Sequence, residues 1–315
     1  MAGSGLVTAF AGRLEDYLQL RRSLGHKLET AGRLLPGFVA YLDAIGAETV
    51  TVSVALAWAQ QPETDPTTSV RARRMGVVRG FARYMAGIDP RTQVPPAGLV
   101  TYRQRRRQPY LYSPADVRAL MRAARRGIAL PLRAATMETI IGLLATTGMR
   151  VGEAIRLDSA DLNWDEGWLA VLQTKFRKSR QLPLHPSTMN ALARYTRTRD
   201  RLAPLPDSPA FFISTTGTRL LYPNISLTFR TLVRATGIGA GSSSRPRIHD
   251  LRHSFAVQTL TDWAREGSDI QARLPWLSTY LGHTEPRYTY GYLSAAPELL
   301  MLAAQRLHPD RQDQP

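Results

Sequence analysis

Apolar side chains recur at helical spacing through the first third of the chain. In residues 6–22, for example, Leu6, Phe10 and Leu14 follow one another at intervals of four, which places them on one face of a helix. The segments that share this pattern are 6–22, 29–45, 52–60 and 67–86. The last of them also carries five arginines around its apolar positions. The pattern predicts a small helical bundle that includes one basic helix.

The composition changes after residue 86, where proline, glycine and arginine replace the periodic apolar positions. Such a stretch is typical of a linker between domains. Its arginines cluster at Arg103, Arg105, Arg106 and Arg107. A solvated linker is one interpretation of this cluster, and contact with phosphate groups is the other. We predict a helical domain at 1–98, a basic linker at 99–112 and a second domain at 113–315.

The second domain opens with "SPAD", in which Ser113 is placed to cap a helix and Pro114 to take its first position. Period-two alternation in 168–174 and 180–185, on either side of the basic "KFRKS", predicts a β-hairpin. Helical patterns predict helices over 114–126, 131–147, 186–203, 223–235, 249–265, 272–281 and 296–307. The predicted fold is therefore mainly α with a small antiparallel β-sheet.

The net charge points to a polyanionic partner. The 315 residues include 41 Lys and Arg against 25 Asp and Glu, a formal charge of +16, and nucleic acid is the first candidate for such a protein. The chain has no cysteine, so it has no disulfide or thiolate metal site. We find neither a signal-like leader nor an apolar run of membrane-spanning length, and we expect a cytoplasmic protein.

Two segments place basic side chains where chemistry is possible. In "TTGMRVGE", a helix ends at Gly148 and restarts, with Arg150 and Glu153 three apart on one face. A surface ion pair is the alternative there. In "QTKFRKSRQLPL", Lys175 lies near the hairpin tip, where it is either a solvated turn residue or a proton donor that reaches into a groove. A shifted register would give that position to Lys178.

Two further segments contain histidine. In "HDLRH", His249, Arg252 and His253 have helical spacing, and the two histidines resemble the zinc-protease pattern H-E-x-x-H. The glutamate of that pattern is missing, and Arg252 would bring a cation close to the metal, so we expect no metal here. His283 follows Leu281-Gly282 and precedes a run of tyrosines.

Taken in order, these motifs resemble the tyrosine recombinase (phage integrase) family. The matched segments are "TGMRVGE", "TKFRKSRQLPL", "HDLRH", "LGH" and a terminal tyrosine, and they span residues 147–292. The N-terminal helices and basic linker resemble the family's SAM-like core-binding domain, and the second domain resembles its α+β catalytic domain. The ending "TYGYLSAAPEL" is similar to that of transposon-borne members.

The resemblance also selects among Tyr288, Tyr290 and Tyr292. Members of the family commonly place their nucleophile nine residues after the histidine of "LGH", and counting from His283 gives Tyr292. A strand would not separate the three tyrosines, because they share one parity. In a helix, Tyr288 would share a face with Tyr292 and would be its main rival.

The resemblance implies that the protein cuts and rejoins DNA strands through a 3′-phosphotyrosyl intermediate. Arg150 and Arg252 would clamp the phosphate, because guanidinium groups are permanently charged and fork onto phosphate oxygens. The other implied roles are attack by Tyr292, a hydrogen bond from His283, support of proton transfer by His249, protonation of the leaving oxygen by Lys175, orientation of the site by Glu153, and DNA contacts from Arg177 and Lys178.

The implied function is that of a site-specific recombinase or integrase of a mobile element. It would act as a homo-oligomer, a tetramer that brings two DNA duplexes together, and would need neither a metal nor another cofactor. When bound to DNA, it would be associated with the nucleoid. The enzymatic alternative is a type IB topoisomerase, and the non-enzymatic one is a DNA-binding regulator that does not cleave.

Overall fold

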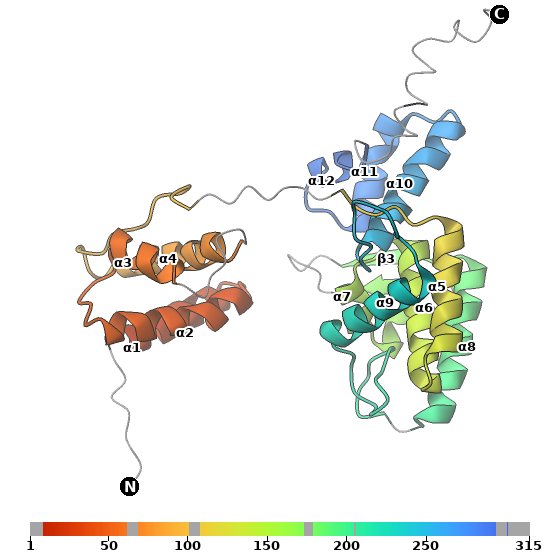
Figure 1. The fold of residues 1–315 in the computed structure, drawn as a ribbon, viewed down its shortest axis with the longest axis horizontal. Helices are drawn as coiled ribbons and strands as arrows, with labels where there is room; N and C mark the ends of the chain where they lie inside the picture. Colours follow the sequence, from red (N-terminus) through yellow and green to blue (C-terminus); the bar gives the residue numbers. More distant parts are fainter. Residues whose placement is uncertain are drawn as a thin grey trace, which may run out of the picture. The chain divides into compact units, whose positions relative to one another are not determined.

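The computed structural model describes residues 9–61, 69–100, 108–172, 179–204 and 206–293, together with Met301. The chain divides into two compact units, Met1–Arg106 and Arg107–Pro315, and each unit has its own hydrophobic core. Figure 1 shows helices in both units and strands in the second. The prediction of a mainly helical fold with a small antiparallel sheet is confirmed.

The first unit is a bundle of helices. Its described helices are α1 (Ala9–Ser23), α2 (Glu29–Ala44), α3 (Val52–Ala59) and α4 (Val70–Ala86). They correspond to the four predicted segments and pack in the pairs α1 with α2, α2 with α4, and α3 with α4. Phe38, Leu42 and Phe81 are fully buried between them, which accounts for the helical spacing of these apolar positions.

The second unit is organised around α6, which packs against α5, α8, α9 and α10 and lies beside α5 and α8 in Figure 1. The helices of this unit in the described residues are α5 (Pro114–Gly127), α6 (Pro131–Thr147), α7 (Val151–Arg156), α8 (Pro186–Leu202), α9 (Tyr222–Thr236), α10 (Asp250–Arg265), α11 (Ile270–Leu281) and α12 (Arg287–Tyr290). The predicted helices up to residue 281 are confirmed. The helix predicted over 296–307 lies outside the described residues except at Met301.

The sheet of the second unit is antiparallel. Strands β1 (Leu162–Asn163), β2 (Trp168–Val171) and β3 (Arg180–Pro183) are ordered β1-β2-β3, with Leu169 opposite Leu182. The strands of the predicted hairpin are confirmed. β1 was not predicted, because two residues are too few to show an alternating pattern.

The start of α5 follows the predicted capping chemistry. The Ser113 hydroxyl accepts a hydrogen bond from the Asp116 amide at 3.1 Å, and the Asp116 carboxylate accepts one from the Ser113 amide at 3.0 Å. The residue before this cap, Tyr112, is buried, and its amide donates to the Ser254 hydroxyl at 2.7 Å. The last residues of the predicted linker therefore pack against the second unit.

Glycine is required where α6 ends. Gly148 caps the helix with φ of 60°, in the left-handed region that side chains other than glycine adopt at a cost. A Cβ atom at this position would also lie 2.3 Å from the ring of Phe255. Close packing of α6 against α10 therefore depends on glycine, as does the reversal that lets α7 begin at Val151.

We predict that Gly148→Ala destabilises the protein more than Gly237→Ala. Gly237 ends α9 with a similar φ of 69°, but a Cβ atom there would meet nothing within 4 Å. The control variant should therefore lose only the stability that left-handed strain costs an alanine, about 1–2 kcal/mol. Gly148→Ala should lose roughly 1–3 kcal/mol more through overpacking. Urea unfolding measures both losses, and equal losses would show that the contact with Phe255 is easily relaxed.

Candidate active site

The histidine, arginine and tyrosine residues singled out from the sequence meet in the second unit, at the ends of four helices. Arg150 immediately precedes α7, His249 and Arg252 lie at the start of α10, His283 follows α11, and Tyr292 follows α12. Each side chain is thus held by a helix terminus rather than by a long loop. Helix termini also leave backbone groups available for side chains to bind.

The "LGH" motif forms the C-terminal cap of α11. Gly282 has φ of 68°, its amide donates to the Thr279 carbonyl at 2.9 Å, and the amide of His283 donates to the Ser278 carbonyl at 3.0 Å. This bonding pattern is that of a Schellman cap, which requires a left-handed residue. The cap turns the chain so that His283 leaves the helix beside its last carbonyl groups.

Those last carbonyl groups hold three arginines. Each of three consecutive carbonyls accepts a hydrogen bond from a different guanidinium group. The pairs are Arg180 Nε to Tyr280 O at 2.7 Å, Arg252 Nη2 to Leu281 O at 2.8 Å, and Arg150 Nη2 to Gly282 O at 3.1 Å. The carbonyl end of a helix carries partial negative charge, so it attracts cations.

Arg252 also joins the ends of two helices. Its Nη1 donates to the carbonyl of Gly148 at 2.8 Å, while Nη2 binds the end of α11. The residue is only 2% exposed. Burial lowers the pKa of Arg252 to about 10, and Arg150 acts in the same direction while Tyr292 opposes it. The guanidinium therefore stays charged at neutral pH although it is removed from water.

Arg150 and Glu153 form an ion pair in which the carboxylate is buried and the Arg150 side chain is 36% exposed, so it is not the fully exposed surface pair that was the alternative. Nη1 of Arg150 lies 2.8 Å from the Glu153 carboxylate, which is 1% exposed, and the backbone amide of Arg150 donates to the same carboxylate at 2.8 Å. Burial raises the pKa of Glu153, but the contacts with Arg180 and Arg150 outweigh it and leave the pKa below its usual value. Glu153 is therefore ionised.

Arg180 belongs to this cluster, although the sequence analysis did not select it. It lies on β3, its side chain is 11% exposed, and it donates to both carboxylate oxygens of Glu153, at 2.9 and 3.3 Å. A signal for it was present in the alternation of β3. Arg180 shares a strand face with buried Leu182, and a charged residue on a core-facing position requires a partner.

The two predicted histidines differ in exposure. His283 is partly buried, and its Nδ1 lies 2.8 Å from the Thr289 hydroxyl. Burial, followed by the charges of Arg252 and Arg150, lowers the pKa of His283 to about 3. The pKa of His249 is also lowered, first by partial loss of water around the ring and then by the charges of His253 and Arg252. The residue as a whole is exposed, so contact with solvent limits this lowering.

The three tyrosines are separated by burial. Tyr292 is 5% exposed, whereas Tyr288 and Tyr290 are 48% and 51% exposed. The ring of Tyr292 stacks on that of His283, with centroids 6.0 Å apart, and contacts the ring of His253 edge-on at 5.4 Å. Tyr292 therefore lies within the arginine and histidine cluster.

The condition under which Tyr288 and Tyr292 would share one helical face is not met. α12 ends at Tyr290, and the amide of Tyr292 then donates to the carbonyl of Thr289 at 3.0 Å, an i to i−3 bond typical of a 3₁₀ turn. Residues three apart share a face in such a turn. Tyr292 therefore aligns with Thr289, which is 1% exposed. The ring of Tyr288 also contacts that of His283 edge-on, with centroids 6.2 Å apart, so burial separates Tyr292 from Tyr288 and contact with His283 does not.

Seven predicted residues are not placed by the structure. The hairpin tip with Lys175, Arg177 and Lys178 lies outside the described residues. The same holds for the linker arginines Arg103, Arg105, Arg106 and Arg107. Their roles stay predictions.

The described part of the chain contains no group of three or more His, Cys, Asp or Glu side chains arranged to hold a metal ion. In the "HDLRH" segment, the rings of His249 and His253 instead contact each other edge-on, with centroids 5.1 Å apart. None of the described helices is long and apolar enough to cross a membrane.

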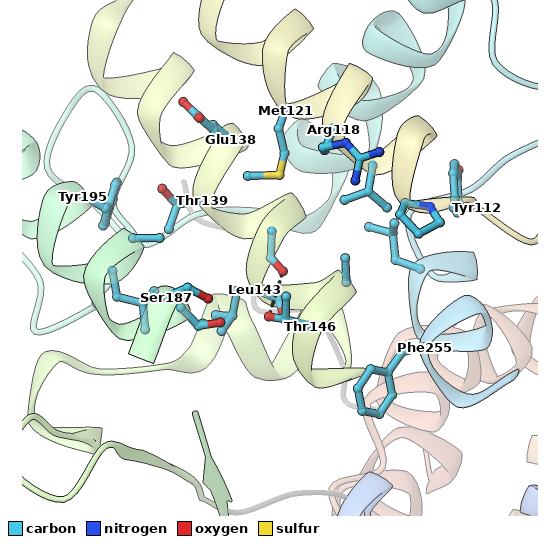
Figure 2. A pocket seen from close by; sticks show the side chains of 18 of the residues that line it. Tyr112, Arg118, Met121, Glu138, Thr139, Leu143, Thr146, Ser187, Tyr195 and Phe255 are labelled. Carbon is cyan, nitrogen blue, oxygen red and sulfur yellow. Dashed lines mark hydrogen bonds between the residues drawn. The ribbon is translucent and has the colours of Figure 1, made fainter. Parts of the chain in front are cut away.

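A groove of about 1030 Å³ lies among α5, α6, α8 and α10. Figure 2 shows Met121, Leu143 and Phe255 along it. On α10, Leu251 lines the groove directly beside Arg252 in the sequence, and Phe255 lines it one helical turn later. The groove therefore runs close to Arg252 along this helix, but none of the predicted catalytic residues that the structure describes lines it.

Comparison with known proteins assigns the chain to a family. Residues 112–298 match the phage integrase family. Over 307 residues the chain is 43% identical to y4rB of Sinorhizobium fredii (strain NBRC 101917 / NGR234), which is named an integrase/recombinase, and the match covers 96% of this chain and 98% of the relative. It is 28% identical to the tyrosine recombinase XerD of Caulobacter vibrioides (strain ATCC 19089 / CIP 103742 / CB 15), over 98% and 92% of the two chains.

The fold agrees with that assignment. The structure of the Tn1549 transposon integrase, determined in complex with a circular intermediate DNA, superposes with a TM-score of 0.62, 16% identity, and coverage of 94% of this chain and 99% of the other. The chain belongs to the phage integrase family and is a tyrosine-type site-specific DNA recombinase.

Proposed function

We propose that Tyr292 is the nucleophile of strand cleavage. Its hydroxyl oxygen would attack the scissile phosphorus and form a 3′-phosphotyrosine, while the bond from phosphorus to the 5′-oxygen breaks. The 5′-hydroxyl of a second strand would then attack the phosphotyrosine, release Tyr292 and restore a phosphodiester. The observation that carries this proposal is that Tyr292 is the buried tyrosine of the three and contacts His283 and His253.

Arg150 and Arg252 would bind the non-bridging oxygens of the phosphate. A guanidinium has five N–H donors, and the contacts of Arg252 with Gly148 and Leu281 employ two of them. These contacts fix the orientation of the group before DNA arrives. Donors that are preorganised in this way stabilise the negative charge of the transition state without reorganisation.

The histidines would assist through neutral rings. A lowered pKa keeps His283 uncharged at neutral pH, and a hydrogen bond from Thr289 to Nδ1 would leave the proton on Nε2, where it can be donated to a phosphate oxygen. We propose that His249 supports removal of the Tyr292 proton. Lys175, with Lys178 as its rival, would protonate the leaving 5′-oxygen.

Double-stranded DNA is the proposed partner. The net charge of +16 suits a polyanion, and the structurally similar Tn1549 integrase has been determined with DNA. Exchange between two duplexes requires four strand cuts, so four copies with one tyrosine each would form the synaptic complex. The resemblance of the ending to transposon-borne proteins supports service to a mobile element, acting at the nucleoid.

Strand exchange distinguishes this proposal from its two alternatives. A recombinase would join two differently labelled duplexes that carry the DNA flanking the gene. A type IB topoisomerase would relax supercoiled DNA without joining the two labels. A regulator would bind the duplexes and form no covalent adduct with either of them.

We predict that Tyr292→Phe binds DNA normally but forms no covalent adduct, because the change removes only the hydroxyl. Tyr288→Phe and Tyr290→Phe are the matched controls, since they remove the same atom from exposed rings. Both should form adduct within roughly tenfold of the wild-type rate, about 1.4 kcal/mol in barrier. Adduct formation is measured on denaturing gels, with a nicked duplex made from the DNA that flanks the gene. Peptide mapping that places the adduct on Tyr288 or Tyr290 would overturn the assignment.

We predict that strand cleavage continues unchanged in EDTA. The arginines supply the positive charge that a divalent metal would otherwise provide, and the buried carboxylate among them, Glu153, already binds Arg150 and Arg180. Adduct formation is measured with EDTA and with added magnesium. A metal-dependent nuclease on the same duplex is the control for chelation, and loss of adduct in EDTA that magnesium reverses would contradict the arginine clamp.

We predict that His283 contributes no pH dependence to DNA binding between pH 8 and 6. Burial and the charges of Arg252 and Arg150 lower its pKa to about 3, so the ring is neutral throughout this range and His283 gains or loses no proton there. The dissociation constant is measured at constant ionic strength. His283→Gln should show the same pH dependence as the wild type, and a pH dependence that this substitution abolishes would contradict the neutral role of His283.

A further inference from the structure

The carboxylate of Glu153 is shared between two arginines in unequal ways. The guanidinium of Arg180 reaches both carboxylate oxygens, at 2.9 and 3.3 Å, whereas that of Arg150 reaches one, at 2.8 Å. The remaining acceptor capacity is taken by the backbone amide of Arg150. Glu153 is thus bound by two positive charges, of which Arg180 makes the forked contact typical of a strong pair.

Arg180 and Arg150 also differ in exposure. The Arg180 side chain is 11% exposed and the Arg150 side chain 36%. Arg180 is turned inward, where its Nε binds the Tyr280 carbonyl and its guanidinium packs against Gly282, so closely that a Cβ atom there would lie 2.6 Å from Nη1. Arg150 is the member of the pair that keeps contact with solvent and can therefore be reached by a substrate.

We propose that Arg180 is a positioning residue for strand cleavage: it compensates the charge of Glu153 and thereby leaves the charge of Arg150 for the scissile phosphate. With Arg180 present, the three side chains sum to +1. Without it, the buried carboxylate of Glu153 neutralises the partly exposed guanidinium of Arg150, and the site attracts the developing negative charge of the transition state less strongly. This inference rests on the proposed role of Arg150.

The proposal predicts a specific coupling between Arg180 and Glu153. Arg180→Gln should slow adduct formation on the nicked flanking duplex by roughly 10²-fold, the size of effect expected when a preorganised donor is lost. DNA affinity should change by less than about threefold, because one contact is a small part of the total attraction of so basic a protein. Arg180→Lys keeps the charge and should retain more activity than Arg180→Gln.

The double variant Glu153→Gln/Arg180→Gln tests whether the charge of Glu153 causes the slow reaction of Arg180→Gln. It removes the uncompensated carboxylate, so adduct should form faster than in Arg180→Gln alone. If Arg180 served only to hold β3 against α11, the second substitution would restore nothing or would slow the reaction further. A rate for the double variant at or below that of Arg180→Gln would therefore overturn the proposal.

Arg199→Gln is the matched control. The Arg199 side chain is 10% exposed and, like Arg180, it binds a carboxylate and a backbone carbonyl, those of Asp200 and Phe211, but it lies on α8 among none of the proposed catalytic residues. Its loss should leave the rate of adduct formation unchanged at equal folded fraction. A wild-type chain that forms no adduct would refute the proposed function, whereas an active wild type with an equally active Arg180→Gln would refute only the role of Arg180.

Discussion

The carbonyl end of α11 determines where the arginines of the candidate active site lie. The last carbonyl groups of a helix lack partners within the helix and carry partial negative charge. Here Tyr280, Leu281 and Gly282 each supply such a group to one guanidinium. Hydrogen bonds to charged groups contribute about 1.5–3 kcal/mol each, and the three arginines come from β3, α10 and the turn before α7. One helix terminus therefore fixes three elements that are distant in the sequence.

The same arrangement leaves the site short of negative charge. Three guanidinium groups converge, and within the described contacts Glu153 is the carboxylate that compensates them. Burial and, to a smaller extent, repulsion from Arg150 oppose this convergence, as the lowered pKa of Arg252 indicates. Backbone carbonyls offset the cost only in part, because they are dipoles rather than charges. A phosphate diester would supply the missing charge, which supports the proposal that these arginines bind the scissile phosphate.

Much of this site could be predicted because its chemistry is local in the sequence. Arg150 and Glu153 share one helical turn, as do His249 and Arg252, and the glycine of "LGH" indicates the helix cap at Gly282. Arg180 was missed because its partners lie 27 and 100 residues away, and no spacing rule reports such contacts. Its only local signal was a charge on the buried face of β3. The relation of Tyr288 to Tyr292 could not be settled for a different reason: it required one continuous helix, and helical periodicity does not foresee that α12 ends between them, at Tyr290.

The distance of nine residues from His283 to Tyr292 has a physical meaning in this fold. The Schellman cap of α11 releases His283, and α12 follows over Arg287–Tyr290. Thr289 then joins the two ends, since its hydroxyl lies 2.8 Å from Nδ1 of His283 and its carbonyl accepts from the amide of Tyr292. The ring of Tyr292 thereby stacks on the ring of His283, the residue at which the segment begins. One buried threonine thus connects both ends of the nine-residue segment, so the length of the segment is tied to the position of the Tyr292 ring against His283.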